Sequence, residues 1–346
     1  MPFKSITLLF CFVQGYGIAQ MSDFEHINFT KANNIAQLHQ GQKLDNLPLL
    51  AYQLTYKLPT EVEKFRAIYF WVCQNIKGDN AQQNKVARAQ ETYKGNESGY
   101  LEWNTNYKSI AFKTLRKSNK TMCTGYAYLI RELCHLSNIE CKIVNGYGRT
   151  VEANIGSLDV VNHSWNAVKL NNKWYLCDAS WSSGYIDAYG TFISTYNDGY
   201  FLTEPAFFSK THFPKDTTWL LTKTMSAEDF IQAPLLYGEA YKYDIQPKSP
   251  KKMNLIINKG DTIAFSFVSP NHFSGTISMV RFIGEKEKEY PINDLKYSNG
   301  SISFTYTFNH KGSFDTHIKV NTDLIASYTI KVRRKKAQQI HETEGL

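Results

Sequence analysis

Cysteine is scarce in this sequence, and long hydrophobic runs are lacking after residue 20. Six cysteines in 346 residues are too few for a disulfide scaffold, and no C-x-x-C pair indicates a zinc knuckle. Because no run of about 18 apolar residues follows residue 20, we expect no transmembrane segment in the mature chain. The content of 42% hydrophobic and 20% charged residues excludes a disordered or collagen-like chain.

The first 20 residues have the three-part layout of a secretory signal peptide. Lys4 precedes an apolar run, and small residues then lead to Ala19, which predicts cleavage after Ala19 or Gln20. A buried N-terminal strand is the alternative interpretation. We therefore expect an exported protein, periplasmic or extracellular, in which five cysteines remain and at least one thiol is unpaired or bonds another molecule.

Two segments have the spacing of helices that bury one face. Apolar residues recur every three or four positions between Asn28 and Asn75, and Thr60 with Glu63 forms a candidate capping box. A second helix is predicted from Cys123 to Leu136. Residues 77–108 are polar without a clear period, so we expect them to cross a surface, beside a cleft.

Short strands are predicted at about 141–147, 163–170 and 174–180, and a further set follows a change in composition near residue 244. The segment 246–252 holds two prolines and three lysines, as a linker between domains does. Five alternating segments beyond it predict a small Ig-like β-sandwich: Thr262–Val268, Thr276–Ile283, Ser301–Phe308, Phe314–Val320 and Leu324–Val332. The expected organisation is a signal peptide (1–20), a helical segment plus catalytic-type domain (21–244), the sandwich (245–335) and a basic and polar tail (336–346).

Positive charge gathers near the C-terminus. The formal net charge is +8, and the stretch from Lys331 to Lys336 contributes five positive charges. This stretch is either a solvated tail or a contact to an anionic polymer or cell surface. We expect no nucleic-acid partner.

Cys123 stands at the predicted start of a helix, within Thr121-Met122-Cys123-Thr124-Gly125. Unpaired N–H groups and the helix dipole at that position favour the thiolate, the form that attacks a carbonyl carbon. Gly125 would leave room for a substrate backbone. Simple packing is the alternative explanation for one cysteine at a helix start.

The register of a predicted hairpin places the side chains of His163 and Asp178 on the same face. Asn171 and Asn172 tolerate positive φ, so they fit a two-residue turn that pairs Leu170 with Lys173. Asp178 then lies on the same face as His163, within reach of a hydrogen bond between the two side chains. A three-residue loop would place them on opposite faces.

Together these segments resemble the transglutaminase-like superfamily of papain-type folds, in particular the kyphoscoliosis peptidase-like branch with its bacterial secreted members. The resemblance covers roughly residues 60–222. It is carried by Phe65–Val72, by the Cys123, His163 and Asp178 segments in the family's order, and by Tyr200–Pro205 and His212–Pro214. The fold class expected from it is α+β, a papain/transglutaminase-like core with N-terminal helices, followed by the Ig-like sandwich.

The resemblance implies roles for these residues. Cys123 would be the nucleophile, His163 the general base and acid, and Asp178 the residue that orients the imidazole. Trp165, Trp181, Gly125 and Thr124 would belong to the substrate cleft. The calcium-binding acidic loops of animal transglutaminases have no counterpart here, so we expect no metal and no cofactor.

Two further residues have competing interpretations. Cys177 faces the other side of its strand from Asp178, which favours a place in the core. His212 is either structural or a second base.

The expected function is a secreted cysteine-dependent enzyme that transfers the acyl group of peptide or isopeptide amides in a protein or peptide substrate. Hydrolysis is favoured over cross-linking, because secretion puts water in excess and no amine-donor site is visible. The alternative is a binding module that keeps the fold but in which the triad of Cys123, His163 and Asp178 is catalytically inactive. A purely structural role is a third interpretation.

Overall fold

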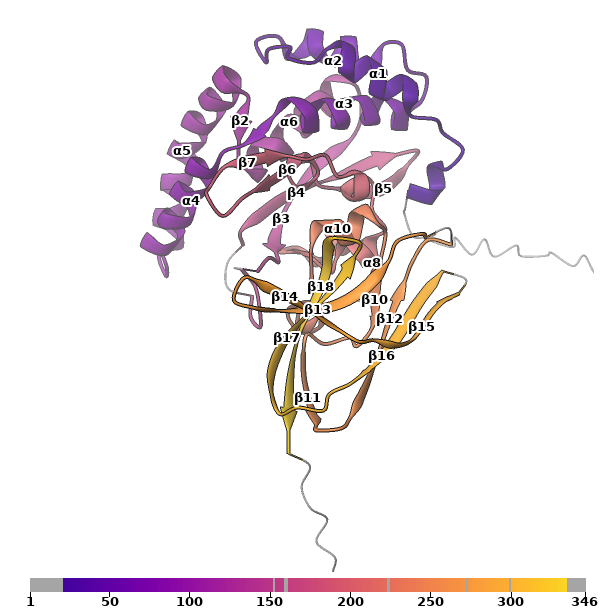
Figure 1. Cartoon of the computed structure of the whole chain (residues 1–346). Helices are drawn as coiled ribbons and strands as arrows, with labels where there is room; N and C mark the ends of the chain where they lie inside the picture. The colour runs from indigo at the N-terminus through magenta and orange to yellow at the C-terminus, as the bar shows by residue number, and fades with distance from the viewer. Residues whose placement is uncertain are drawn as a thin grey trace, which may run out of the picture.

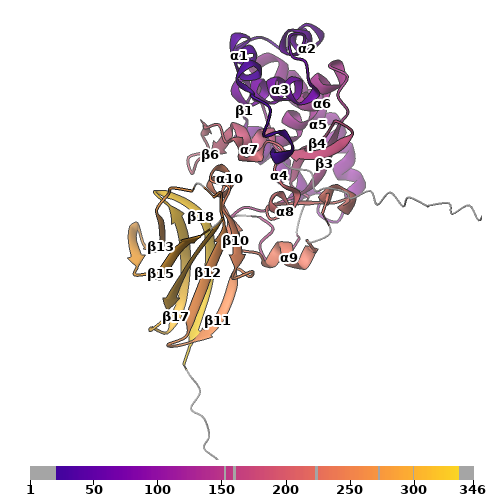
Figure 2. The same cartoon turned by 90° about the vertical axis from the view of Figure 1, so that its right-hand side faces the viewer.

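The computed structural model describes residues 21–151, 153–158, 161–222, 225–271, 273–298 and 300–334. The predicted signal peptide (1–20) and C-terminal tail (336–346) lie outside the described residues. Helices and a small sheet form one end of the molecule, and a β-sandwich forms the other (Figure 1). Figure 2 shows α8 (Pro205–Phe208) and α10 (Gly238–Lys242) where the two ends meet.

Six α-helices make up most of residues 21–136: α1 (Thr30–Leu38), α2 (Leu47–Thr55), α3 (Glu61–Asn75), α4 (Asn80–Thr92), α5 (Glu97–Ser118) and α6 (Cys123–Leu136). The predicted capping box at α3 is present, since Thr60 and Glu63 bond each other's backbone N–H groups. The helix predicted from Cys123 to Leu136 is also confirmed, and Asn138, with φ of 57°, follows its end.

Residues 77–108, which have no clear apolar period in the sequence, form α4 and the first half of α5. Asp79 and Asn96 cap the two helices by accepting backbone N–H groups. α4 buries only Gln82, Val86 and Ala89, so its apolar stripe is too narrow to show as a period. Within the described residues, no helix combines the length and apolar character needed to cross a bilayer.

A four-stranded antiparallel sheet lies beneath α6, in the order β5 (Lys173–Cys177), β4 (His163–Leu170), β3 (Cys141–Gly148) and β8 (His212–Pro214). The predicted turn is confirmed: Asn171 and Asn172 have φ of 49° and 64°, and Leu170 pairs with Lys173. One face of the sheet packs on the helical core, and the other contributes Trp165 and Leu176 to a second core. The sheet is therefore covered on both faces, like the middle layer of a three-layer domain.

The C-terminal part is a sandwich of two sheets. Four strands form one sheet: β10 (Gln246–Ser249), β12 (Thr262–Val268), β16 (Ser301–Thr307) and β15 (Asn293–Ser298). The other sheet contains β11 (Asn254–Asn258), β18 (Asp323–Arg333), β17 (Gly312–Val320), β13 (Ile277–Ile283), β14 (Lys286–Tyr290) and the short β9 (Leu235–Leu236). The five predicted strands are thus confirmed, within one or two residues at their ends, and Phe265, Phe267 and Tyr328 lie between the sheets.

The predicted linker at 246–252 is not a linker. Gln246–Ser249 pair with β12, and the backbone N–H of Met253 donates to Gln232 at 2.7 Å. Tyr241 and Phe207 share one hydrophobic core with the sandwich. A proline is tolerated in β10 because this strand lies at the edge of its sheet.

Candidate active site

Cys123 is the first residue of α6, and only Met122 separates it from the two-residue strand β2 (Lys120–Thr121). Met122 precedes it in an extended conformation and has no side chain that caps the helix. The first backbone N–H groups of α6 are therefore not used by a capping side chain, and their dipoles favour negative charge at this end. The Cys123 side chain is partly exposed, whereas Cys73, Cys134, Cys141 and Cys177 are buried, and all five thiols are free.

His163 and Asp178 form the expected hydrogen bond. His163 opens β4, and its Nε2 lies 2.6 Å from Oδ2 of Asp178. The third strand is shorter than predicted, however: it ends at Cys177, and Asp178 is instead the N-cap of α7 (Ala179–Ser183). The cap conformation turns the carboxylate toward both the helix start and the imidazole.

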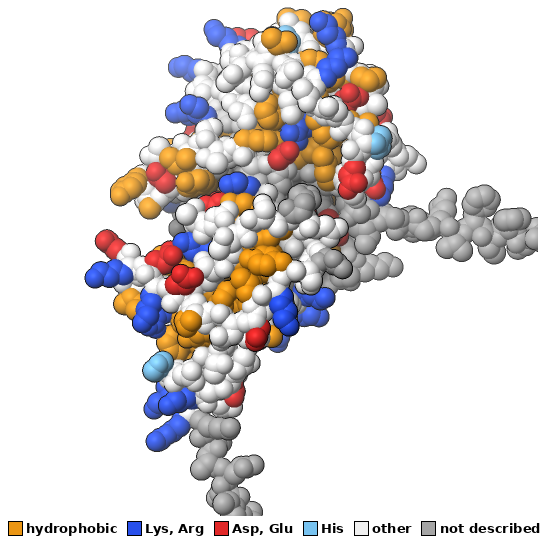
Figure 3. All heavy atoms as spheres, turned by 45° about the vertical axis from the view of Figure 1, so that its right-hand side comes forward, with side chains coloured by type: hydrophobic (Ala, Val, Ile, Leu, Met, Phe, Trp, Pro, Cys, Tyr) orange, Lys and Arg blue, Asp and Glu red, His pale blue; other side chains and the backbone are white. Residues whose placement is uncertain are grey.

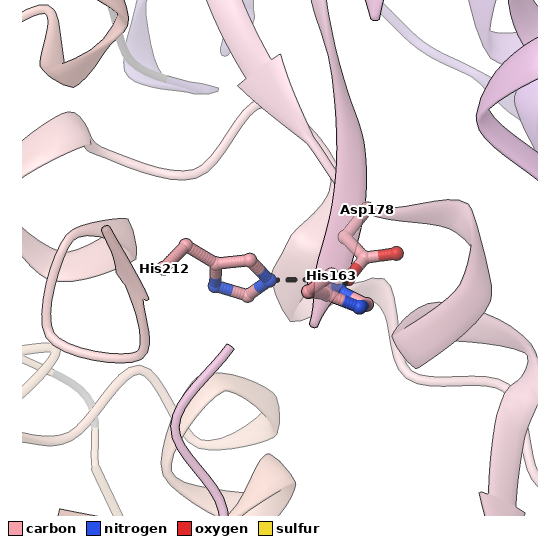
Figure 4. Close-up of side chains that lie close together, drawn as sticks. All are labelled: His163, Asp178 and His212. Atoms are coloured by element: carbon pink, nitrogen blue, oxygen red, sulfur yellow. Dashed lines mark hydrogen bonds and ion pairs between the residues drawn. The ribbon is translucent and has the colours of Figure 1, made fainter. Parts of the chain in front are cut away.

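Asp178 is almost completely buried, yet its carboxylate accepts five hydrogen bonds. Oδ1 accepts from the N–H and hydroxyl of Ser180, at 2.8 and 2.7 Å, and from the N–H of Trp181 at 3.1 Å. Oδ2 faces His163 at 2.6 Å and Nε2 of His212 at 3.1 Å. Figure 4 shows both imidazole rings directed at this carboxylate.

The environment of Asp178 keeps it ionised. Burial by itself favours the neutral acid, but the charge and hydrogen bond of His163, and then those of His212, hold its pKa well below the usual range. A buried carboxylate with five donors is stabilised as an anion, because charge-assisted hydrogen bonds replace its lost hydration.

The pKa values of His163 and Cys123 shift in opposite directions. Burial opposes the charged imidazole, but the charge and hydrogen bond of Asp178, followed by those of Cys123, raise the pKa of His163 to about 10. Burial likewise opposes the thiolate, yet the hydrogen bond and charge of His163 and a bond from the backbone of Ser164 lower the pKa of Cys123. The two shifts together favour a thiolate–imidazolium pair over a neutral pair.

The sequence allows His212 to be either structural or a second base, and the structure places its Nε2 3.1 Å from Oδ2 of Asp178. It stacks on Phe208 with ring centroids 4.0 Å apart, and its Nδ1 lies 2.9 Å from Oγ1 of Thr211. Burial outweighs the hydrogen bond and charge of Asp178 and lowers the pKa of His212 to about 4. A buried neutral imidazole with both nitrogens bonded cannot serve as the base for a partly exposed thiol.

A comparison with protein families finds that residues 49–179 match the model of the transglutaminase-like superfamily. The chain carries a transglutaminase-like domain. The match contains Cys123, His163 and Asp178, whereas His212 lies beyond its end. With the sheet between helices and the following sandwich, the expected fold class is confirmed.

Known relatives cover only part of this chain. Human (Homo sapiens) kyphoscoliosis peptidase is 34% identical over 204 residues, 54% of this chain and 27% of that protein. The mouse (Mus musculus) protein of the same name is 31% identical over 234 residues, 65% of this chain and 32% of that protein. This chain thus spans about a third or less of the length of these relatives. A crystal structure of a TGase superposes with a TM-score of 0.27 at 17% identity, over 44% of this chain and 32% of that one.

The residues expected in the cleft of the transglutaminase-like domain divide into two groups. Trp181 is partly exposed, with its ring centroid 4.8 Å from that of His163. Trp165, in contrast, is buried and lies 5.1 Å from the His212 ring, so it packs beneath the imidazoles and does not wall the cleft. Cys177 is in the core as expected, with its thiol directed to the carbonyl of Asn166.

Thr124 and Gly125 have packing roles that the sequence did not reveal. Thr124 Oγ1 lies 3.3 Å from the hydroxyl of Ser164, which ties the start of α6 to β4. Gly125 is buried, and a Cβ at this position would collide with the side chain of Thr121. The expected role of Gly125, making room for a substrate backbone, is therefore replaced by close packing of α6 on β2.

One cluster of described residues has a composition suited to a metal ion: His163, Asp178 and His212. Their candidate ligand atoms lie within 4.8 Å of one another. The same atoms, however, bond one another, and the pKa of His163 is raised, whereas a metal ligand must be a neutral imidazole. Hydrogen bonding accounts for the cluster as it stands, and we assign no step to a metal.

Proposed function

We propose that this protein is a cysteine-dependent acyl-transfer enzyme that acts on peptide or isopeptide amides. The observation that carries the proposal is the placement of Cys123 at the start of α6 together with the bond between His163 Nε2 and Asp178 Oδ2 at 2.6 Å. The hydrogen bond and charge of His163 lower the pKa of Cys123, in agreement with this geometry. A thiolate at the start of a helix, paired with an imidazolium and a buried carboxylate, has the parts required for nucleophilic catalysis.

The first half of the reaction forms a thioester. The Cys123 thiolate attacks the amide carbon, so a C–S bond forms and the carbonyl oxygen becomes an oxyanion. His163 then gives its proton to the departing nitrogen, the C–N bond breaks, and an amine leaves. Because Nε2 of His163 is bonded to Asp178, the proton for the amine comes from Nδ1.

The oxyanion needs hydrogen-bond donors fixed before the reaction begins. The backbone N–H of Cys123 is the first candidate, because it lies at the uncapped start of α6. Its position follows from the contact between Gly125 and Thr121, which sets how closely α6 approaches β2.

The second half removes the acyl group. Water gives up a proton to neutral His163 and attacks the thioester carbon, which releases a carboxylic acid and restores the thiolate–imidazolium pair. An amine nucleophile would instead form a new amide. We favour water, because the proposed export places the enzyme in dilute solution and no amine-donor site could be identified from the sequence.

Labelling with an activity-based probe tests this proposal. Wild-type protein should bind an electrophilic probe covalently at Cys123, and Cys123→Ala should abolish labelling, whereas the buried-thiol control Cys141→Ala should leave it intact. A peptide-library screen on the same three proteins would then identify the cleaved amides. If the probe fails to label Cys123 while the protein is folded, the binding-module alternative replaces the enzyme.

Export and a polymer contact remain predictions from the sequence. The basic stretch begins inside β18, where Lys331 and Arg333 are exposed on either side of buried Val332. Figure 3 shows Lys and Arg side chains at the end of the sandwich that lies farthest from the helices. These two side chains therefore belong to a strand, and only the residues after it are candidates for a solvated tail.

A further inference from the structure

The two imidazoles on Asp178 are not equivalent. His163 is slightly exposed and is linked to Cys123, whereas His212 is completely enclosed and has no contact with the thiol among its described bonds. Both nevertheless share a single acceptor, Oδ2 of Asp178. A second buried histidine on the carboxylate requires an explanation beyond packing, because an apolar ring would fill the same space without a polar group to satisfy.

The ionised carboxylate of Asp178 determines which nitrogen of His212 carries the proton, because its oxygens can only accept and Nε2 lies 3.1 Å from Oδ2. Tyr241 Oη lies 2.5 Å from Oγ1 of Thr211, and Thr211 Oγ1 lies 2.9 Å from Nδ1 of His212. Because Tyr241 also donates to the carbonyl of Phe207 at 3.1 Å, its hydroxyl does not set the tautomer; the unprotonated Nδ1 that remains accepts from Thr211. Neutral His212 therefore carries its proton on Nε2 and donates it to Asp178.

We infer that His212 is a positioning residue for the triad: its Nε2–H holds Oδ2 of Asp178 in place, so that the carboxylate keeps the His163 ring directed at Cys123. This inference rests on the proposed function. Oδ1 is already fixed by Ser180 and Trp181. Without His212, Oδ2 would be bonded by His163 alone and would follow that ring as it moves.

The need for a second donor is greatest during turnover. When His163 has given its proton to the departing amine, the imidazolium charge that stabilises Asp178 is gone, although the carboxylate remains buried. His212 keeps donating at this stage, because its own proton is not part of the transfer. The titratable side chains around His212 are Asp178, His163 and Tyr200, and Tyr241 joins them through Thr211.

Two substitutions of His212 separate its hydrogen bond from its shape. His212→Phe keeps a ring to stack on Phe208 but removes the donor to Asp178. His212→Gln loses the ring but places an amide N–H near the position of Nε2. The matched control is His317→Phe, in β17 of the sandwich, where the histidine bonds Ser327 at 2.6 Å.

The measurement is the rate of alkylation of Cys123 by iodoacetamide between pH 5 and 9, on full-length folded protein. We expect alkylation of Cys123 in His212→Phe to be about tenfold slower than in the wild type at pH 6 and equally fast at pH 9. The reason is that the thiolate at pH 6 depends on the aligned imidazolium. In His212→Gln and His317→Phe the alkylation rate should stay within about twofold of the wild-type rate at both pH values. A purely structural role would lower the melting temperature without changing this profile.

The outcomes distinguish this inference from the proposed function. If wild-type Cys123 titrates like an ordinary thiol, the proposed function fails. If the wild type has a low-pH thiolate but His212→Phe leaves the profile unchanged, His212 is packing only and the inference is wrong. Should His212→Phe not fold, Thr211→Val replaces it: loss of the hydroxyl that bonds Nδ1 and so orients the His212 ring should slow alkylation at pH 6 about threefold. An unchanged rate would overturn the inference.

Discussion

His163 and Asp178 meet beyond the end of the strand ladder that joins their elements. The last paired residues of β4 and β5 are Asn166 and Cys177, yet Nε2 and Oδ2 lie 2.6 Å apart past that point. The contact is therefore held by the N-cap of α7 and by the five donors on the carboxylate, as well as by the hairpin.

The first prediction concerns the pH dependence of Cys123. The thiol pKa is lowered and that of His163 is raised to about 10, so the ion pair exists at pH values above the first and below the second. Alkylation should stay fast at pH 6, and His163→Ala should slow it at least tenfold there while changing it little at pH 9. Asp178→Ala should have a smaller effect of the same sign. Equal slowing at both pH values would mean that access, and not ionisation, had changed.

The second prediction concerns acid stability. Folding lowers the pKa of His212 from 6.5 to about 4. Between these pH values the unfolded chain binds a proton at His212 and the folded protein does not, so stability is lost as the pH falls from 6.5 toward 4. Between these values the free energy of unfolding of the wild type should decrease by about 1.4 kcal/mol per pH unit more than that of His212→Gln. Urea denaturation at pH 4.5, 5.5 and 6.5 measures the two slopes. Parallel slopes would show that His212 titrates alike in both states.

The third prediction concerns the start of α6. Gly125→Ala should destabilise the protein by about 1–3 kcal/mol and reduce alkylation of Cys123, because the new Cβ collides with Thr121 and displaces the helix start. Adding Thr121→Ala to Gly125→Ala should restore part of both losses. Thermal unfolding and the alkylation rate test this pair. A Gly125→Ala protein of wild-type stability would mean that α6 can shift freely.

The fourth prediction concerns the segment 246–252. Because Gln246–Ser249 pair with β12 and Met253 bonds Gln232, trypsin should cut slowly at Lys248 although the segment contains three lysines. Digestion with dilute trypsin, followed by mass spectrometry, should show cleavage here only after unfolding begins. Rapid release of an intact C-terminal fragment from the native protein would restore the interpretation of this segment as a linker.

The fifth prediction concerns the N-terminus. Protein recovered after export should begin at Gln20 or Met21, as the layout of residues 1–20 predicts. Edman sequencing or intact mass measurement decides this. A mature chain that keeps Met1 would remove the reason for favouring hydrolysis in dilute surroundings.

Much of the triad could be predicted from the sequence because local rules determine it. The helix start at Cys123 follows from apolar spacing, and the Asn171-Asn172 turn fixes the register of β4 and β5. That register placed Asp178 on the same face as His163. The strand predicted at about 174–180 nevertheless ends at Cys177, one residue before Asp178. Both features depend on residues close together in the chain.

Other features were decided only by tertiary contacts. His212 comes 34 residues after Asp178, and its place on Oδ2 requires β8 to pair with β3 at the far side of the sheet. The edge strand β10 has a composition typical of a linker, and only its partner β12 makes it a strand. No local pattern contains these pairings, because they gain their stability from surfaces that meet only when the chain has folded.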